Sequence, residues 1–424
     1  MTYALYHLLS WFTYPFLKAW VYYRCLRGKE DKSRFQERFG LTHKARPEGT
    51  LLWFHGASIG ESLSFLPVLE AFRKKYPDIH FLATTGTKGA AELMSQRLPE
   101  GCIHQYIPLD NPLFVRRFLN HWAPQAAFFT ESDLWPNLIM KTHRRCSIFL
   151  LNARLSERSF ERWKWAKGFF TEILDSFTLI FPQTELDGQR LEYFTKTNVK
   201  FFGNLKFVGE PIPASQVDLK KLRKQIGERP LWIASNTHEG EEDVILEIHE
   251  TLRKKFKDLL LILIPRHERR LPEIIPTLER LGLSFVQRSE KKQLSKTTSV
   301  YLVDTLGEMG VFYSLGPIVF MGGSLFPKVG GHNILEPARF GDIALFGPHM
   351  DNNQDMAEFM LKNKAAIQVV TSQELGEQVS DLLGSPKKCK EFSGRVKKTL
   401  ESKDILGPLF KEIQKKLPFL LLRG

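Results

Sequence analysis

The segment Leu51–Phe72 contains residue types that could act as a nucleophile or as a base. It reads LLWFHGASIGESLSFLPVLEAF, an apolar run that reaches polar and glycine residues just before a helical pattern. Residues 56–60 match G-x-S-x-G, the turn on which an α/β-hydrolase presents a nucleophilic serine, here Ser58. A hydrolase would also need a histidine, and His332 and His349 follow later predicted strands.

The same turn has two other interpretations. Ser58 and Glu61 have the spacing of a capping box, in which the serine caps a helix and the glutamate reaches back to the backbone. Alternatively, Glu61 faces a cleft between two domains and acts there as a base. The motif follows the first strand of its domain, whereas a nucleophile elbow follows several strands, so the pattern favours the cap over the elbow.

A second group of acidic residues follows another predicted strand. The segment AAFFTESDLWPNL, residues 126–138, places Glu131 and Asp133 just after an apolar run. Open α/β sheets bind ligands outside the carboxyl ends of their parallel strands, so these carboxylates are candidate site residues. The alternative is a polar first turn of the next helix.

The second half of the chain carries features that could bind an anion. Ser235 and Thr237 follow a predicted strand in LWIASNTHEGEED, and Arg266 follows another in LILIPRHERR. Free amides at a helix start and a fixed guanidinium group are both suited to phosphate.

The strongest local pattern is PIVFMGGSLFPKVGGHNILEPARFGD, residues 317–342. Two glycine pairs let the backbone approach a ligand closely, and Glu336 could accept hydrogen bonds from ribose hydroxyls. The alternative is a plain glycine-rich connection. The pattern is neither a Walker A motif nor G-x-G-x-x-G, which argues against an ATPase or a dinucleotide-binding enzyme.

Charge and composition narrow the partners. A formal net charge of +13 over 424 residues indicates a polyanionic partner: nucleic acid, an anionic membrane surface or a phosphate-rich substrate. The chain has no nucleic-acid motif and its charges do not cluster in one segment, so we expect no nucleic-acid partner. The four cysteines form no C-x-x-C pair, which suits a reducing compartment, and the histidines lack ligand spacing, so we expect no metal.

Two aromatic, basic segments suit a membrane. Residues 3–23 are mostly apolar and precede several arginines and lysines, which predicts an N-terminal anchor with the rest of the chain in the cytoplasm. Pro15 and Lys18 leave open whether this helix spans the bilayer or lies in its interface. Residues 151–170 mix basic and aromatic side chains and suit a membrane surface or an acidic lipid head group, or else form a solvated helix face.

The order of apolar runs predicts an α/β protein with two doubly wound parallel sheets. Strand patterns alternate with helical patterns from residue 50, stop at a linker near KFVGEPIPASQVD, and then restart. The predicted strands are 51–54, 80–84, 126–129, 147–151 and 179–181 before the linker, and 231–234, 259–264, 299–303, 318–320 and 343–346 after it. We predict an N-terminal anchor and basic connector over 1–48, one Rossmann-like domain over 49–208, and a second over 209–424 that includes the closing C-terminal helices.

Seven segments in this order resemble the 3-deoxy-D-manno-octulosonic acid (Kdo) transferases of Gram-negative lipopolysaccharide synthesis: HGASIGES, TESDLWPN, NARLSER, GNLKF, ASNTHEGEE, PRH and GGHNILEP. The resemblance runs from about Leu51 to Asp355. It implies a GT-B fold of two Rossmann-like domains facing a cleft, with the acceptor on the first and the nucleotide sugar on the second. It also implies CMP-Kdo as donor, a lipid A precursor as acceptor, no metal or other cofactor, and work at the cytoplasmic face of the inner membrane.

The resemblance also assigns roles to residues. It implies that Glu61 is the general base and that Glu131 and Lys206 stabilise the transition state. Asp133 departs from the family, which more often has Glu there. The implied contacts to the donor's CMP portion are Pro265, Arg266, Gly307, Glu308, Met309, Asn333, Ile334, Leu335 and Glu336, and Ser235 and Thr237 would face the phosphate.

These roles fit the chemistry of an inverting transfer. A base takes the proton from the acceptor hydroxyl while Arg266, Lys206 and helix N-termini stabilise the departing phosphate. Ser58 is then a helix cap. The alternatives are a GT-B glycosyltransferase with another nucleotide sugar and an anchored serine hydrolase that uses Ser58. The sequence leaves open how many Kdo residues are added and at which positions.

Overall fold

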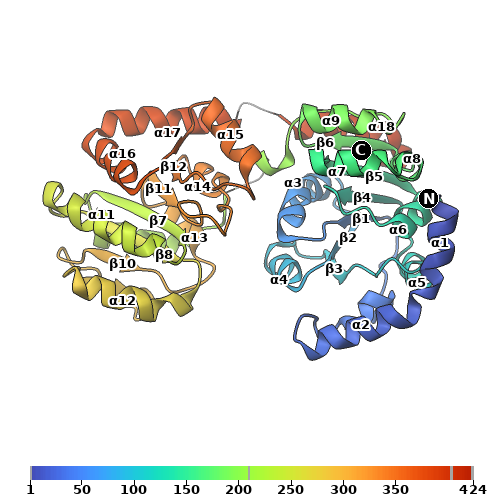
Figure 1. The fold of residues 1–424 in the computed structure, drawn as a ribbon, viewed down its shortest axis with the longest axis horizontal. Helices are drawn as coiled ribbons and strands as arrows, with labels where there is room; N and C mark the ends of the chain where they lie inside the picture. Colours follow the sequence, from blue (N-terminus) through green and yellow to red (C-terminus); the bar gives the residue numbers. More distant parts are fainter. Residues whose placement is uncertain (1, 209–210, 402–403, 422–424) are drawn as a thin grey trace. The chain divides into compact units, whose positions relative to one another are not determined.

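The computed structural model describes residues 2–208, 211–401 and 404–421, which form two α/β units (Figure 1). Unit 1 comprises Met1–Gly209 and Lys403–Gly424, and unit 2 comprises Glu210–Ser402. Each unit contains one parallel sheet covered by helices, as the alternating sequence pattern predicts.

The sheet of unit 1 has six parallel strands in the order β3-β2-β1-β4-β5-β6. This is the strand order of a doubly wound sheet. The chain adds strands outward from β1 to β3, returns to the middle of the sheet, and then adds strands in the opposite direction from β4 to β6. The strands are β1 Leu51–His55, β2 His80–Thr85, β3 Ile103–Tyr106, β4 Ala126–Thr130, β5 Ser147–Ala153 and β6 Leu179–Pro182.

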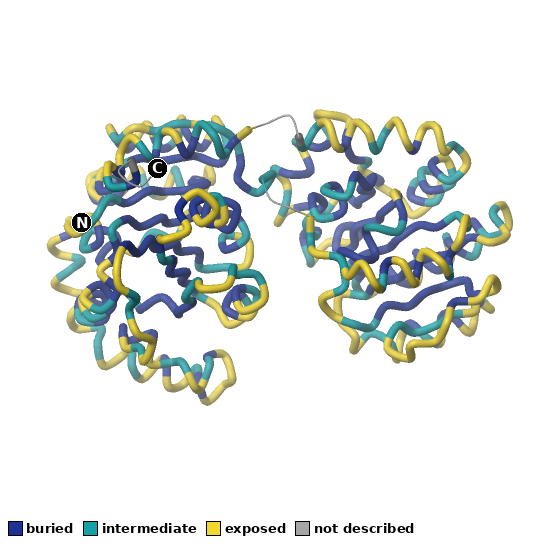
Figure 2. The backbone as a smooth tube through the Cα atoms, turned by 180° about the vertical axis from the view of Figure 1, so that it is seen from behind, coloured by how far each residue is buried: buried dark blue, intermediate teal, exposed yellow. Residues whose placement is uncertain are grey.

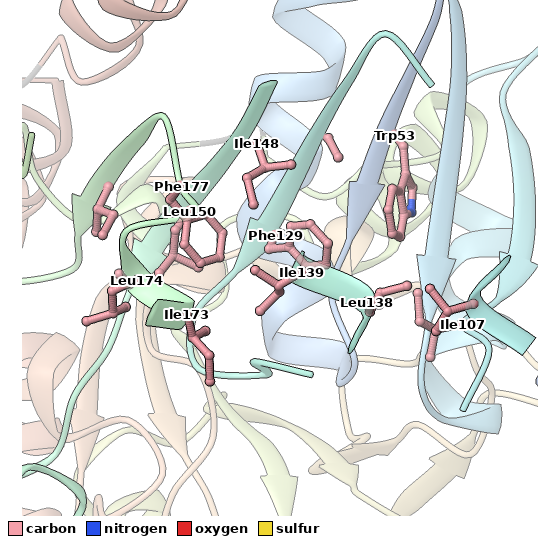
Figure 3. Close-up of a cluster of buried hydrophobic side chains, with 14 of the residues drawn as sticks. Trp53, Ile107, Phe129, Leu138, Ile139, Ile148, Leu150, Ile173, Leu174 and Phe177 are labelled. Atoms are coloured by element: carbon pink, nitrogen blue, oxygen red, sulfur yellow. The ribbon is translucent and has the colours of Figure 1, made fainter. Parts of the chain in front are cut away.

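Helices cover both faces of this sheet. Successive side chains of β1 point to opposite faces, so Trp53 joins one buried cluster and Phe54 joins the other. Figure 3 shows part of the first cluster, which combines Trp53, Phe129 and Leu150 of the sheet with buried residues of α6 and α8. The helices before the linker are α1 Tyr3–Phe12, α2 Tyr14–Leu26, the 3-10 helix η1 Phe35–Phe39, α3 Ile59–Lys75, α4 Lys88–Arg97, α5 Pro112–Trp122, α6 Pro136–His143, α7 Glu157–Lys164, α8 Lys167–Leu174, α9 Glu185–Glu192 and η2 Leu205–Phe207.

The last two helices, α18 Leu406–Lys416 and α19 Pro418–Leu421, belong to unit 1, which differs from the predicted domain 209–424. The ring centroids of Phe410 and Phe72 are 4.2 Å apart, and Lys200 forms an ion pair of 2.6 Å with Glu412. The amphipathic pattern of α18 indicates that one face must be buried, but it does not specify against which sheet.

Unit 2 has a seven-stranded parallel sheet in the order β13-β12-β11-β7-β8-β10-β9. Its central strands are buried except at Asn236 and Pro265, and they appear mostly dark blue in Figure 2. The strands are β7 Leu231–Thr237, β8 Leu260–Pro265, β9 Phe285–Gln287, β10 Val300–Leu302, β11 Ile318–Met321, β12 Ile343–Phe346 and β13 Ala366–Gln368. The helices are α10 Gln216–Ile226, α11 Glu241–Lys255, η3 Glu268–Arg270, α12 Leu271–Arg280, α13 Met309–Tyr313, α14 Leu335–Ala338, α15 Gln354–Lys362, α16 Ser372–Gly384 and α17 Pro386–Glu401.

The N-terminal segment differs from the predicted single anchor helix. It forms two helices that meet at Thr13, just before Pro15, and none of the described helices is long and apolar enough to cross a membrane. One side of α1 is bonded to unit 1: Tyr6 donates to Asp110 at 2.8 Å, and the ring of His7 lies 2.6 Å from the Asn137 side-chain oxygen. These polar contacts make α1 part of the fold.

The buried His249 on α11 predicts a pH dependence of stability. Trp232 donates to its Nδ1 at 3.3 Å, its Nε2 lies 3.0 Å from the carbonyl oxygen of Ser299, and burial lowers its pKa from 6.5 to about 3. The unfolded chain therefore binds a proton here before the folded chain does. The stabilisation is complete above pH 6.5 and is lost progressively as the pH falls towards about 3.

We expect His249 to cost the protein about 1.4 kcal/mol of unfolding free energy between about pH 7.5 and about pH 5.5. Denaturant titrations of the wild type and of His249→Gln at both pH values measure this contribution. The loss should be smaller in the variant by about that amount. An equal loss in both proteins would contradict the assignment.

Candidate active site

The turn between β1 and α3 forms the predicted capping box. The Oγ of Ser58 accepts a hydrogen bond from the amide of Glu61 at 3.3 Å, and Glu61 Oε2 accepts from the amide of Ala57 at 2.6 Å. The hydrogen bonds of the described residues include none between Ser58 and a histidine. Ser58 therefore has the surroundings of a helix cap and lacks a partner that would activate it as a nucleophile.

A buried histidine at the end of β1 bonds to an aspartate that follows the end of β4. His55, the last residue of β1, is 1% exposed, and its Nε2 lies 3.1 Å from Oδ2 of Asp133. Its Nδ1 lies 3.0 Å from the hydroxyl oxygen of Thr84, and Trp135 donates to Asp133 at 2.9 Å. The sequence pattern indicated Asp133 but not His55, although His55 stands at a strand end beside the Ser58 turn.

The two neighbouring carboxyl groups have pKa values shifted in opposite directions. Burial raises the pKa of Glu61, the negative charge of Asp133 raises it further, and His55 opposes the shift in part. Burial also disfavours ionised Asp133, but hydrogen bonds from His55 and Trp135 outweigh it and leave the pKa of Asp133 below its usual value. Asp133 thus stays ionised while Glu61 becomes the stronger base, a division typical of acid–base sites.

Glu131 and Lys206, 75 positions apart in the sequence, form an ion pair with 2.8 Å between Oε1 and Nζ. Two asparagines hold the segment that carries Lys206. Asn152 accepts from the amide of Leu205 at 2.9 Å, and Asn204 accepts from the amide of Lys206 at 2.9 Å. The structure therefore brings together two residues that the family resemblance links, and it adds Asn152 and Asn204 as residues that position the lysine.

Three residues at or just after the carboxyl ends of their strands have a left-handed backbone conformation. Glu131, Asn152 and Asn236 have φ angles of 61°, 52° and 55°. The strand register shifts at both asparagines, as in a β-bulge. Asparagine tolerates this conformation better than most residues, and a bulge redirects side chains at the end of a strand.

In unit 2, two of the residues predicted to face a phosphate are buried in the sheet. Ser235 and Thr237 are both 0% exposed. The hydroxyl oxygens of Ser235 and Tyr313 are 2.9 Å apart, and Thr237 Oγ1 has no hydrogen-bond partner among the described residues. Their contact with a phosphate stays a prediction.

The first glycine pair of unit 2 is held by a buried carboxylate. Glu241, 1% exposed on the first turn of α11, accepts hydrogen bonds from the amides of Gly323, Ser324 and Leu325 at 2.7, 3.0 and 3.0 Å. It also accepts from the amide of His238 at 3.0 Å. These amides are thus occupied by the protein's own carboxylate, and Gly323 supplies the positive φ of 69° that the turn requires.

The other predicted contacts of unit 2 lie in segments that follow the carboxyl ends of β8, β10 and β11, the edge where open α/β sheets bind ligands. Arg266 is exposed, whereas Ile334 and Leu335 are buried. The predicted set is Pro265 and Arg266 after β8, Gly307, Glu308 and Met309 after β10, and Asn333, Ile334, Leu335 and Glu336 after β11.

The segment after β10 is fixed by an ion pair that the sequence does not reveal. Arg288 donates to Glu308 at 2.6 Å through its terminal nitrogen, and the hydroxyl of Thr305 also donates to Glu308. These bonds, together with the nearby guanidinium charge, hold the pKa of Glu308 below its usual value. Arg288 therefore keeps Glu308 ionised and orders the turn at Gly307.

Within the described residues, no three His, Cys, Asp or Glu side chains are arranged to hold a metal ion. The predicted independence from a metal stays a prediction.

Comparisons with known proteins identify relatives along most of the chain. Residues 33–209 match the family described as 3-Deoxy-D-manno-octulosonic-acid transferase (kdotransferase). A 3-deoxy-D-manno-octulosonic acid transferase of Rickettsia bellii is 38% identical over 397 residues, which cover 94% of each protein.

Solved structures share the fold at low sequence identity. A UDP-GlcNAc 2-epimerase from Neisseria meningitidis is 15% identical with a TM-score of 0.57, and the match covers 87% of this chain and 100% of the epimerase. A glycosyltransferase from Rickettsia africae is 8% identical with a TM-score of 0.54, and the match covers 89% of this chain and 100% of that enzyme. The two-unit architecture is therefore that of the GT-B glycosyltransferases, and the chain belongs to the 3-deoxy-D-manno-octulosonic acid transferase family.

Proposed function

We propose that this protein transfers Kdo from CMP-Kdo to a lipid A precursor with inversion at the anomeric carbon. The observation that carries the proposal is that two neighbouring carboxyl groups of unit 1 have pKa values shifted in opposite directions. The pKa of Glu61 is raised, whereas that of Asp133 is lowered, so Asp133 stays ionised. Membership of the Kdo transferase family supports the sugar and the pathway.

Glu61 is the proposed general base. It takes the proton from an acceptor hydroxyl while the oxygen bonds to the anomeric carbon and the bond from that carbon to the CMP phosphate breaks, with its electron pair leaving on the phosphate. A glutamate whose pKa is raised accepts this proton more readily than an ordinary glutamate. His55 and Asp133 set its charge environment, and the amide of Ala57 holds its carboxylate.

The remaining charges stabilise the developing negative charge. Lys206 supplies a cation in unit 1, and its ion pair with Glu131 fixes where the ammonium group lies. We assign the nucleotide to unit 2, with Arg266 on the phosphate and with the ordered turn at Glu308 and the segment from Asn333 to Glu336 on the cytidine portion. This arrangement needs no metal and no other cofactor.

The lipid acceptor is reached at an anionic inner-membrane surface, with both units on the cytoplasmic side. The outward sides of α1 and α2 expose large apolar residues, among them Phe12 at 69% and Phe16 at 75% (Figure 2). Trp165, which follows the basic helix α7, is 93% exposed. Aromatic residues beside basic ones suit the head-group region of an anionic leaflet, so we propose an interfacial anchor.

The geometry favours a glycosyltransferase over the serine hydrolase, because the Ser58 hydroxyl caps α3. A transferase that uses another nucleotide sugar is the remaining alternative, since the contacts to the cytidine portion depend on the family resemblance.

The first test compares Glu61→Gln with the wild type and with Ser58→Ala. Each protein receives CMP-Kdo and a tetraacylated lipid A precursor in detergent, and mass spectrometry measures the lipid products. We expect Glu61→Gln to slow transfer by about 10²–10⁴-fold, because glutamine keeps the bond to Ala57 but cannot take a proton.

Ser58→Ala is the matched control on the same turn. It should lower stability by about 1 kcal/mol through loss of the cap and should keep transfer. Loss of transfer in Ser58→Ala, with Glu61→Gln unaffected, would reverse the roles given to these residues. The number of Kdo units added by the wild type is read from the same spectrum.

A second test addresses the membrane surface. We expect Phe12→Ser combined with Phe16→Ser to weaken binding to vesicles that contain anionic phospholipid by about tenfold or more, because two largely exposed rings lose their insertion energy. Val217→Ser on α10, 64% exposed, is the matched control and should bind like the wild type. Equal vesicle binding by all three proteins in a sedimentation assay would contradict the interfacial role of α1 and α2.

A further inference from the structure

Two histidines of unit 2 form a direct ring-to-ring contact that the sequence pattern does not indicate. His238 follows β7, and His332 follows the second glycine pair, 94 positions later. Their Nε2 atoms are 2.8 Å apart, and the rings are nearly parallel at 11° with centroids 5.1 Å apart. Both side chains are only partly buried, so the pair borders solvent.

The contact fixes how many protons the pair can carry. At a separation of 2.8 Å, one proton lies between the two Nε2 atoms. Two protons there would repel each other, and without a proton two nitrogen lone pairs would face each other. In the neutral pair, one ring then carries a proton on Nδ1 and the other has a lone pair there. One added proton gives a cation with an N–H group at both Nδ1 positions. Neither Nδ1 has a hydrogen-bond partner in the described part of the chain.

The charged groups around the pair keep it neutral. Burial, together with the repulsion from nearby positive groups, lowers the pKa of His332 to about 4. Burial also lowers the pKa of His238, although Glu241 opposes the shift. The groups that face the pair are Glu241 from α11, Arg266 and His267 after β8, and Arg270 from η3.

An anion bound beside this pair shifts its protonation equilibrium from the neutral form towards the cation. A negative charge favours the protonated form of a neighbouring imidazole, because it compensates the desolvation and the repulsion from the guanidinium groups. The cation then offers two Nδ1–H donors and a full positive charge to the same anion. Charge-assisted hydrogen bonds of this kind are about twice as strong as neutral ones.

We propose that His238 and His332 bind the phosphate of the nucleotide and take up one proton from solvent when it binds. The proposal rests on the proposed function, which assigns the nucleotide to unit 2. Two predicted nucleotide contacts adjoin the pair: Asn333 follows His332 directly, and the amide of Arg266 bonds to the carbonyl oxygen of Thr237, the neighbour of His238.

The added proton also suits the reaction. The phosphate of a nucleotide sugar carries one negative charge, and the departing nucleotide monophosphate carries up to two. A cationic pair therefore binds the departing group more strongly than the donor, and this difference lowers the barrier to bond cleavage. The imidazoles form no covalent bond, and the proton remains on Nδ1.

Isothermal titration calorimetry with CMP tests the proposal. Titrations at about pH 7.5, where a phosphomonoester is largely dianionic, use two buffers with different ionisation enthalpies. The measured enthalpy should differ between buffers by the amount expected for an uptake of about one proton per CMP. Cytidine, which lacks the phosphate, should show no such difference.

His332→Gln is the informative variant, because a glutamine amide can keep a contact near the Nε2 position but cannot titrate. We expect it to bind CMP about tenfold more weakly and to lose the buffer dependence. His267→Gln is the matched control: the ring centroids of His267 and His238 are 6.0 Å apart, and the hydrogen bonds of the described residues include none between these two side chains. It should keep the uptake.

The possible outcomes distinguish a failure of the histidine-pair proposal from a failure of the assignment of a CMP-linked donor. If CMP binds but the wild type shows no buffer dependence, or if His332→Gln retains it, the histidine pair is not the phosphate site and the CMP assignment stands. If CMP does not bind while another nucleotide binds with a buffer dependence that His332→Gln loses, the pair stands and the cytidine assignment fails. If the wild type binds no nucleotide, both fail.

Discussion

The left-handed backbone at the carboxyl ends of the strands is the constraint on which the rest of the site depends. A buried parallel strand directs its side chains alternately into two packed faces and offers none of them to a ligand. Glu131 and Asn152 leave this pattern through a positive φ, and the bulge at Asn152 lets its side chain reach the segment that carries Lys206. Each such residue costs about 1 kcal/mol or more, which the surrounding hydrogen bonds offset.

Hydrogen bonds to buried carboxylates provide the same kind of order elsewhere. Glu241 binds four amides and fixes the first glycine pair, while Asp110 binds the first amides of α6 and the hydroxyl of Tyr6. The N-terminal arginines behave similarly. Arg24 and Arg38 both pair with Glu30, so part of the positive charge that suggested a membrane partner is neutralised inside unit 1. The number of arginines and lysines in the N-terminal connector therefore overstates the positive charge that it offers to a lipid surface.

The sequence predicted the central strands well, because they are continuous apolar runs. It missed β3, β9 and β13, which are edge strands of three or four residues with polar or half-exposed positions. The predicted single N-terminal helix was wrong, because the continuous apolar stretch conceals the break at Thr13. The residue patterns already indicated Glu61 and Glu131 as candidates, and the family resemblance assigned their roles and added Lys206. His55 and the pair of His238 and His332 were missed because their partners lie 78 and 94 positions away, which only the fold can bring together.

The return of α18 and α19 to unit 1 has a consequence for how the protein is made. Unit 2 is an insertion between two pieces of unit 1, so the second piece is synthesised only after unit 2. Phe72 and its neighbours on α3 therefore lack the cover of Phe410 until the chain beyond unit 2 has been made. A deletion of α18 and α19 would remove part of the core of unit 1, and exposed apolar surface of this kind makes a partly folded chain prone to aggregation.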